Sequence, residues 1–377
     1  MLSLYIHIPF CVNKCPYCGF YSTLYRSGIA EDFLDALHLE MVMRAGEFSK
    51  RAIGSIYIGG GTPTSLSQGQ LTRLFCLIND HVQISQGAEI TIEANPNTID
   101  ASKLVQLKHL GATRISIGAQ SFSNSILTML GRSHTAGQVI ESVYAARSAG
   151  FESIGIDLIF GIPGQTEEQW LKTLEDACSL GPKHISAYGL SIDEGSRWYC
   201  DGRKGTIGPL DDASAAMYVS AIDTLHARGY HQYEISNFCI PGYECRHNVN
   251  YWDRGEYIGL GPASWSFIRN DRWANIDDTD QYISRLKNCC SPKDRNTIES
   301  VNRKQAAIER LFLGLRKTAG IDLACYGSLL GPEELDDLYE RIRDLERRGL
   351  VKHQTGALQL TRQGMLLSNA VLAQMIT

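Results

Sequence analysis

The sequence predicts an α/β protein made of a partial, TIM-like (β/α)6 barrel and a small winged-helix-like α+β module near the C-terminal end. Three observations lead to this prediction. Six short apolar runs alternate with helical stretches over residues 1–190, as in right-handed βαβ units with a parallel sheet. Polar residues follow these runs, at the strand ends that carry the active site in (β/α) barrels. After residue 300, two helical stretches precede a short hairpin and a closing helix.

The predicted strands are short apolar or alternating runs, and the helices between them carry apolar residues at helical spacing. The strands lie at residues 2–8, 53–58, 89–94, 113–117, 153–160 and 183–190, and the helices at 30–45, 71–78, 100–110, 136–149 and 167–180. Gly111 and Gly150 stop two of these helices. Six units fall short of the eight that close a full barrel, so we expect an opening on one side that admits a large substrate.

The second half of the chain is predicted in several parts. A helix at 211–229 and a strand at 230–238 precede residues 245–265, whose many Tyr, Trp, Asn and Gly residues predict an ordered functional loop. A polar linker at 288–300, helices at 304–315 and 332–348, a hairpin at 350–360 and a closing helix follow. We therefore divide the chain into a barrel of residues 1–229, a connecting region of residues 230–290 and a C-terminal module of residues 291–377.

Composition argues against several classes of protein. The 36 Lys and Arg residues against 41 Asp and Glu give a net charge of −5, which predicts no broad attraction to nucleic acid or to a membrane surface. Basic residues do not cluster as a recognition helix requires, so we expect a protein-interaction or lid role for the C-terminal module. The chain has no apolar run of about 18 residues, so we expect no transmembrane helix, and its first residues lead us to expect no signal peptide. With eleven cysteines, these features predict a cytoplasmic protein with reduced thiols.

Three cysteines near the start of the chain predict a metal centre. Cys11, Cys15 and Cys18 follow the first strand with the spacing C-x3-C-x2-C, and nearby prolines and a glycine exclude a regular helix there. Because [4Fe–4S] clusters usually take four cysteines, three thiolates would leave one iron open to a small molecule. The alternatives are ordinary buried cysteines or three ligands of a zinc site, although the sequence lacks a second C-x2-C pair.

Two further motifs accompany the cysteines. Gly59-Gly60-Gly61-Thr62-Pro63 ends the second predicted strand, and His247-Asn248-x-x-Tyr251-Trp252 lies in the aromatic segment. With these motifs the sequence resembles the radical S-adenosylmethionine (SAM) proteins of the oxygen-independent coproporphyrinogen III oxidase-like family, and within it the HemW-type heme chaperones. The resemblance covers nearly the whole chain. It implies a barrel of the radical SAM type, a [4Fe–4S] cluster and S-adenosyl-L-methionine as cofactors, and heme as cargo.

The resemblance also implies that SAM lies at the strand ends. Glycines would let the backbone approach the methionine end of SAM, and an arginine would pair bidentately with its carboxylate. The SAM contacts that the resemblance implies are Tyr5, Gly60, Gly61, Thr62, Glu93, Gln120, Arg132 and Asp157. The residues alone leave two alternatives open: Arg132 as a solvated surface arginine, and the carboxylates as helix caps.

Two departures from the oxidases separate the subgroups of this family. The oxidases carry a further cysteine two residues after the third, where this chain has Phe20, and a longer region before the cluster, whereas Cys11 follows Met1 by ten residues. Both departures favour a heme chaperone that delivers heme to respiratory apoproteins, with the membrane surface as one place of delivery. The alternatives are an oxygen-independent coproporphyrinogen III oxidase, which decarboxylates two propionates, and a relative of the radical SAM methyltransferases.

His247 is the residue for which the resemblance implies a direct contact with heme. A histidine in a segment rich in Tyr and Trp can serve as an axial ligand of heme iron, and Tyr251 and Trp252 can stack on the porphyrin. The alternative is a structural histidine with satisfied hydrogen bonds. The sequence leaves the oligomeric state open, a homodimer included.

Overall fold

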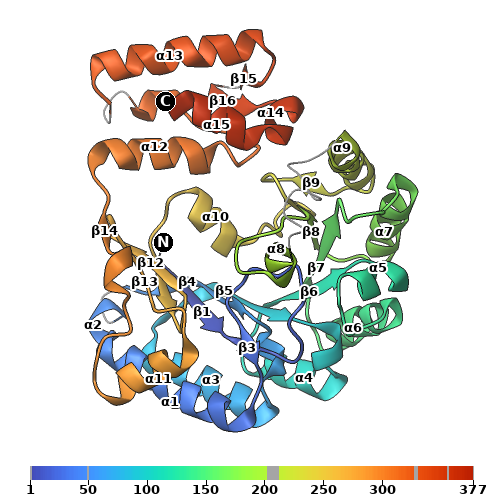
Figure 1. Cartoon of the computed structure of the whole chain (residues 1–377), viewed down its shortest axis with the longest axis vertical. Helices are drawn as coiled ribbons and strands as arrows, with labels where there is room; N and C mark the ends of the chain where they lie inside the picture. The colour runs from blue at the N-terminus through green and yellow to red at the C-terminus, as the bar shows by residue number, and fades with distance from the viewer. Residues whose placement is uncertain (1, 49–50, 202–211, 327–329, 355, 377) are drawn as a thin grey trace.

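The computed structural model describes residues 2–48, 51–201, 212–326, 330–354 and 356–376. The six predicted strands are present in one parallel arrangement: β1 (Leu2–Ile8), β4 (Ile53–Gly60), β5 (Ile84–Ala94), β6 (Arg114–Gln120), β7 (Ser153–Phe160) and β8 (His184–Gly189). They are neighbours in the sheet in that order. Over the described ranges the sheet has two separate ends, so the open barrel predicted from the sequence is confirmed (Figure 1).

Helices pack against the sheet and bury the apolar residues of its strands in one large core. The longer ones are α1 (Ser27–Met43), α3 (Gln68–His81), α4 (Ala101–His109), α6 (Ala136–Ser148), α7 (Glu167–Ser179) and α9 (Asp212–Ala227). Ser67, Thr135 and Thr166 begin three of these helices with capping boxes, which satisfy backbone donors that the helix leaves free. The predicted first residue of α9, Asp211, lies outside the described residues.

Shorter elements complete the barrel. They are α2 (Ala45–Phe48), α5 (Asn124–Met129), α8 (Arg197–Cys200), the 3-10 turns η1 (Pro63–Ser65) and η2 (Pro96–Thr98), and a parallel pair of two-residue strands, β2 (Phe10–Cys11) and β3 (Thr23–Leu24). The β2–β3 pair closes the base of the cysteine loop.

The connecting region differs from the prediction. The strand expected at 230–238 is two short antiparallel strands, β9 (His231–Gln232) and β10 (Asn237–Cys239), because Glu234 accepts a hydrogen bond from the backbone N–H of Ser236 and turns the chain. The prediction of a loop at 245–265 is wrong, since this segment forms α10 (Arg246–Trp252) and β11 (Tyr257–Leu260). β11 pairs in parallel with β1 and adds a seventh parallel strand to the described sheet.

Antiparallel strands extend the sheet beyond β11. They are β12 (Trp265–Ile268), β13 (Asp271–Ala274) and β14 (Glu299–Ser300), with α11 (Thr279–Lys287) and the turn η3 (Arg295–Thr297) between the last two. The predicted polar linker at 288–300 therefore ends in a short edge strand.

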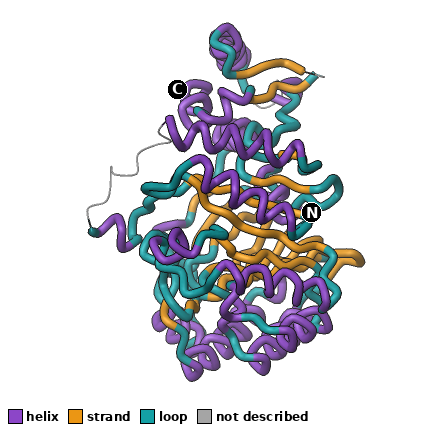
Figure 2. The backbone as a smooth tube through the Cα atoms, turned by 90° about the vertical axis from the view of Figure 1, so that its right-hand side faces the viewer, coloured by secondary structure: helices purple, strands orange, loops and turns teal. Residues whose placement is uncertain are grey.

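The C-terminal module has its own hydrophobic core, which begins at Ala307. It contains α12 (Arg303–Gly314), η4 (Leu323–Tyr326), α13 (Pro332–Arg347), the hairpin of β15 (Val351–Gln354) and β16 (Ala357–Leu360), α14 (Arg362–Leu366) and α15 (Ser368–Ile376). Figures 1 and 2 show this module at one end of the barrel, with α12 nearest to it. The helices and the hairpin agree with the predicted α+β module. None of the helices described is both long and apolar enough to span a bilayer.

Candidate functional site

The three cysteines lie on one loop that begins in β2. The backbone N–H of Cys18 donates to the carbonyl of Cys15 at 3.2 Å, and the loop is anchored where Trp198 donates from its backbone to the carbonyl of Pro16 at 2.9 Å. The hydroxyl of Thr62 lies 3.6 Å from Cys11 Sγ, and Arg132 Nη1 lies 3.5 Å from Cys15 Sγ. Two residues predicted to contact SAM thus contact the cysteine loop.

The cysteine loop fits an iron–sulfur cluster by its donor chemistry. All three thiols are half-buried, and burial raises the pKa values of Cys11 and Cys18, so a bound cation would be needed to hold them as thiolates. As they stand, no three His, Cys, Asp or Glu side chains of the described residues converge on a single metal ion. The thiolates that bind a four-iron cluster lie further apart than the ligands of a single metal ion. Three cysteines on one loop can therefore bind a cluster without converging on one point.

Arg132 is fixed beside this loop. Its Nη2 donates to the carbonyl of Gly118 at 2.8 Å, whereas its buried Nε has no hydrogen-bond partner among the described residues. Because the guanidinium contacts both a strand end and a cysteine, Arg132 is not the solvated surface arginine that the sequence left as an alternative. The unpartnered N–H is available to a carboxylate.

Two carboxylates are half-buried in the sheet: Glu93 is the last residue but one of β5, whereas Asp157, which was predicted to end its strand, lies within β7. Glu93 accepts hydrogen bonds from the hydroxyl of Tyr57 at 2.8 Å and from the backbone N–H of Gly60 at 3.3 Å, and burial raises its pKa to about 7. Asp157 accepts from the hydroxyls of Ser116 and Ser186, and burial raises its pKa as well. Neither carboxylate serves as a helix cap, since the hydrogen-bond donors to both lie on the strands β4, β6 and β8.

The glycines of the second motif are required by their protein neighbours. Gly60 has φ +111°, and a Cβ there would lie 2.7 Å from the ring of His7. A Cβ on Gly61 would lie 2.7 Å from the carbonyl oxygen of Phe10. These contacts bring the strand end against the cysteine loop, and the approach of SAM to the glycines stays a prediction. Gln120 also has a positive φ, of 66°, which is uncommon outside glycine and is found at functional sites.

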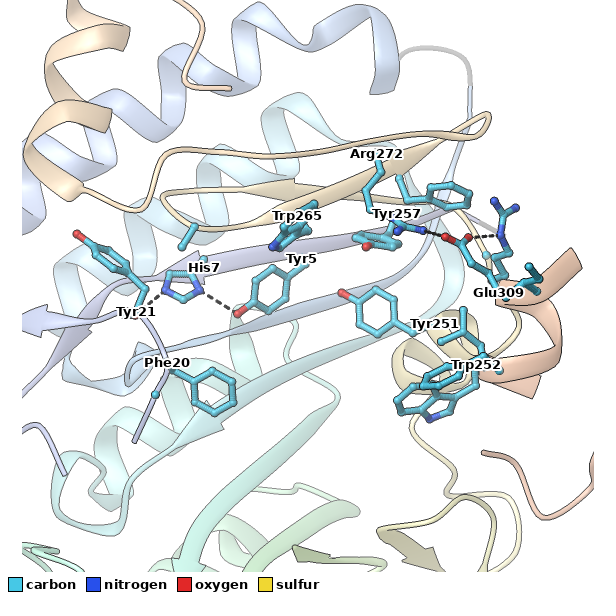
Figure 3. A pocket seen from close by; sticks show the side chains of 18 residues that line it. Tyr5, His7, Phe20, Tyr21, Tyr251, Trp252, Tyr257, Trp265, Arg272 and Glu309 are labelled. Carbon is cyan, nitrogen blue, oxygen red and sulfur yellow. Dashed lines mark hydrogen bonds and ion pairs between the residues drawn. The ribbon is translucent and has the colours of Figure 1, made fainter. Parts of the chain in front are cut away.

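A cavity of about 870 Å³ adjoins the cysteine loop and reaches the C-terminal module. This volume lies in the usual range of cofactor sites, about 300–1,000 Å³. Aromatic side chains from β1, α10 and the β11–β12 hairpin form much of its wall (Figure 3). They include Tyr5, Tyr251, Trp252, Tyr257, Trp265 and Phe267. Phe20 and Tyr21 of the cysteine loop border the same cavity, which therefore connects the predicted cluster site to α12.

Tyr5 and His7 form one polar group in this aromatic wall. The hydroxyl of Tyr5 lies 3.0 Å from His7 Nδ1, and His7 Nε2 lies 2.9 Å from the carbonyl of Tyr21 (Figure 3). Since the carbonyl can only accept, His7 carries its proton on Nε2 and accepts from Tyr5 at Nδ1. Burial lowers the pKa of His7 to about 4, so the ring is neutral at physiological pH.

His247 lies behind the wall of the cavity. It is 1% exposed, and its two ring nitrogens lie 3.0 Å from the hydroxyls of Ser55 and Tyr251. Burial lowers its pKa to about 3. These contacts are those of a structural histidine with satisfied hydrogen bonds, the alternative that the sequence left open. Direct ligation of heme by His247 stays a prediction.

Sequence comparison places these features in a known family. Residues 5–177 match the Radical SAM superfamily, and residues 301–367 match the HemN C-terminal domain. A protein named heme chaperone HemW from Bacillus subtilis is 38% identical over 98% of each chain. A protein of the same name from Mycobacterium tuberculosis H37Rv is 32% identical over 99% of this chain and 94% of its own.

The chain belongs to the HemW family of radical SAM proteins. A solved structure of the radical SAM enzyme coproporphyrinogen III oxidase (HemN) from Escherichia coli aligns with all of this chain and 90% of its own at a TM-score of 0.88 and 26% identity. The family predicted from the motifs is thereby confirmed, as is the α/β fold of the radical SAM type.

Three charged residues of the cavity were missed by sequence reasoning. Arg254 and Arg272 both donate to Glu309 of α12, at 2.6 and 2.5 Å, and all three border the cavity. No local pattern marks Glu309, because its partners lie on other elements far along the chain. In this HemW-family chain, the many aromatic residues of 245–265 were the sequence signal that indicated this part of the cavity wall.

Proposed function

We propose that this chain is a cytoplasmic heme chaperone that binds a [4Fe–4S] cluster, SAM and heme, and delivers the heme to respiratory apoproteins. The observation that carries the proposal is Phe20, which stands where the oxidases have an additional cysteine. Its side chain is 70% exposed and borders the aromatic cavity. A phenyl ring there offers a surface for a flat apolar ligand and no further thiolate.

Cys11, Cys15 and Cys18 would hold the cluster in this proposal. When bound, the reduced cluster supplies an electron for the cleavage of SAM, and the protein orients the reactants and limits the access of water. Arg132 would pair its free N–H with the SAM carboxylate and neutralise charge near Cys15. Thr62 would donate a hydrogen bond to the Cys11 sulfur.

The remaining residues of the predicted SAM site would position SAM. Glu93 and Asp157 would accept hydrogen bonds from its amino group and ribose hydroxyls, and Gln120 would supply an amide at the same edge. Gly60 and Gly61 would present backbone groups, and Tyr5 would border SAM from the side of the cavity. The two half-buried carboxylates on β5 and β7 support these roles.

The aromatic cavity would hold heme. Its volume, its aromatic wall and its two arginines suit a flat macrocycle with two carboxylates. His247, for which the family implies heme ligation, touches this cavity through Tyr251.

Exposed apolar residues surround the cysteine loop and support contact with an acceptor protein. Val12, Phe20 and Leu24 are all more than half exposed, at 55%, 70% and 57%. Apolar patches of this kind mark sites of protein association. We propose that the acceptors are respiratory apoproteins, some of them at the membrane surface. The same exposed residues could also form the contact between two copies of the chain in a homodimer. Nucleic acid is not among the proposed partners.

The alternative function is oxygen-independent coproporphyrinogen III oxidase, which the HemN-like fold favours. The test is an anaerobic assay of the reconstituted protein with coproporphyrinogen III, SAM and a strong reductant, beside a titration with ferric heme. The chaperone predicts one bound heme per chain and no protoporphyrinogen. Formation of protoporphyrinogen would establish the oxidase instead, and an absence of specific heme binding would overturn the chaperone.

A further inference from the structure

We propose that Tyr251, and not a histidine, is the protein ligand of heme iron, and that His247 positions the Tyr251 phenol. The inference rests on the proposed binding of heme to this chain. It goes further by naming the ligand atom, the oxidation state that this atom prefers and the residue that receives the carboxylates. Phenolate is an established axial ligand of ferric heme.

Geometry favours Tyr251 over His247. Both residues lie on α10, one helical turn apart, and the Tyr251 hydroxyl lies 3.0 Å from His247 Nε2. Tyr251 borders the cavity, whereas His247 is 1% exposed. Any iron atom in the cavity therefore meets the phenol first, and His247 would have to give up its hydrogen bond and change rotamer to reach it.

The other histidine of the cavity is also engaged. Tyr5 and the carbonyl of Tyr21 occupy both ring nitrogens of His7. In Figure 3 the hydroxyl of Tyr251 points toward the interior of the cavity, in the direction of Tyr5 and Trp265. Tyr251 therefore presents an oxygen where the two nearby histidines present no free nitrogen.

The contacts of His247 fix how it supports the phenol. Its Nδ1 lies 3.0 Å from the hydroxyl of Ser55, which shares a hydrogen bond of 2.7 Å with Ser3. In the free protein Nδ1–H can donate to Ser55 while Nε2 accepts from Tyr251. The other neutral tautomer donates from Nε2 to a phenolate oxygen and accepts from Ser55 at Nδ1, so the same pair can support either form of Tyr251.

Binding of Tyr251 to ferric iron balances in atoms and charge without an oxidant or a reductant. The O–H bond of Tyr251 breaks, a bond between its oxygen and ferric iron forms, and the water ligand of free ferric heme is released. One proton leaves to solvent, His247 remains neutral and changes tautomer, and iron stays ferric. Burial and neighbouring phenols and a thiol raise the pKa of Tyr251, so the phenol stays protonated until the metal arrives.

An arginine provides a second, independent observation that points to the ligand. The side chain of Arg254 is 5% exposed, and its buried Nη2 has no partner among the described residues. Its Nε donates to Glu309, and its guanidinium carbon lies 4.5 Å from the centre of the Phe267 ring in the cavity wall. Because a buried guanidinium N–H without a partner is costly, this corner of the cavity is complementary to a carboxylate. A heme propionate supplies that group.

The test uses full-length protein, ferric heme and two single variants, Tyr251→Phe and Tyr257→Phe. Both tyrosines border the cavity, and their ring centroids lie 4.6 Å apart in an edge-to-face arrangement. Y257F therefore removes a phenol from the same wall and is the comparison for the spectroscopic signals, not for heme affinity. We expect wild type and Y257F to show a phenolate-to-iron charge-transfer band and an iron–phenolate stretch in resonance Raman spectra. Y251F should lack both signals and bind heme more weakly, while its circular dichroism and iron–sulfur content stay at the wild-type level.

A third variant separates ligand from positioning residue. His247→Gln should keep the charge-transfer band and weaken heme affinity about tenfold to a hundredfold, as is usual for a residue that orients a metal ligand. Unchanged spectra in Y251F with an altered iron signal in H247Q would overturn the inference and establish histidine ligation, leaving the chaperone proposal intact. If wild type bound no heme, the proposed function itself would fail.

Discussion

Glu309 of α12 and Arg254, two residues after the end of α10, form an ion pair that joins the C-terminal module to the barrel across the aromatic cavity. The Arg254 Nε lies 2.6 Å from Glu309 Oε2, and the two side chains are 5% and 21% exposed. Arg272 of β13 donates to the other carboxylate oxygen at 2.5 Å. One carboxylate thus holds two arginines from two different elements, and the position of α12 sets one wall of the cavity.

We predict that Glu309→Gln destabilises the attachment of the C-terminal module. The change leaves Arg254 without its counter-ion, which costs about 3–5 kcal/mol where the pair is fully buried and less here, because the Glu309 side chain is 21% exposed. Limited proteolysis and urea unfolding of the full chain would measure it. Glu334→Gln is the control, because its pair with Lys304 is exposed and should contribute little. Equal proteolysis of the two variants would contradict the prediction.

The carboxylate of Glu93 should make stability depend on pH. Its pKa is raised from 4.5 to about 7 in the folded protein, so the folded state holds this proton more tightly than the unfolded state. The contribution of Glu93 to stability is therefore greatest below about pH 4.5 and falls as the pH rises through about 7.

Glu93→Gln should remove this part of the pH dependence. Glutamine can still accept from the Tyr57 hydroxyl but does not ionise. We expect the difference in unfolding free energy between the variant and the wild type to shift in favour of the variant between pH 5 and pH 8. Chemical denaturation at both pH values measures it, and parallel pH profiles of the two proteins would argue against a raised pKa.

Gly60 should tolerate no side chain. With φ +111° and His7 2.7 Å from an added Cβ, Gly60→Ala requires a strained backbone and a displaced imidazole. We expect the free energy of unfolding to fall by about 1–3 kcal/mol, the usual cost of a strained backbone conformation. Gly69→Ala is the matched control: Gly69 lies in α3, where an added Cβ would meet only Ser67 Oγ at an ordinary contact distance of 4.0 Å, and alanine there should stabilise by about 0.5–1 kcal/mol. Similar thermal midpoints for the two variants would refute the steric argument.

The strand ends could be predicted from sequence because topology alone brings them together. Glu93 and Gln120 lie at the carboxyl ends of β5 and β6, and parallel strands place these ends at one edge of the sheet. The prediction that Asp157 ends its strand is wrong, because β7 continues for three residues beyond it. The cysteine spacing placed the three thiols on one loop for a similar reason, since they are close along the chain, and their binding of a cluster stays a prediction. Local sequence and simple topology were sufficient for both groups.

The cavity could not be predicted in this way because it depends on contacts between distant elements. β11 joins the edge of the sheet beside β1 although more than 240 residues separate the two strands in sequence. His247 and Tyr251 are spaced by four residues, which is a helical signal, but the glycines around them favoured a loop. The burial of Glu40 also depends on distant elements and could not be predicted from local sequence. Glu40 is fully buried, and its hydrogen bonds with Asn275, Tyr282 and Gly261 compensate for that burial.

Loss of the cluster should leave the heme cavity intact. Cys15→Ser removes one of three predicted cluster ligands and the sulfur beside Arg132, so we expect loss of iron and of the visible iron–sulfur absorption after anaerobic reconstitution. The residues found to border the cavity include Gly19, Phe20 and Tyr21 of the same loop, but no cysteine. Their positions depend in part on backbone anchors at Pro9 and Pro16, which the variant keeps.

Heme affinity of C15S should therefore equal that of wild type, while bound iron in the reconstituted protein falls. Cys76→Ser, at an exposed position of α3, is the control for the thiol count and should retain both cofactor signals. The measurement is iron and sulfide content per chain beside a ferric heme titration of each protein. If heme binding in C15S were lost together with the iron, the cluster would be shaping the cavity, and the two sites would have to be treated as one.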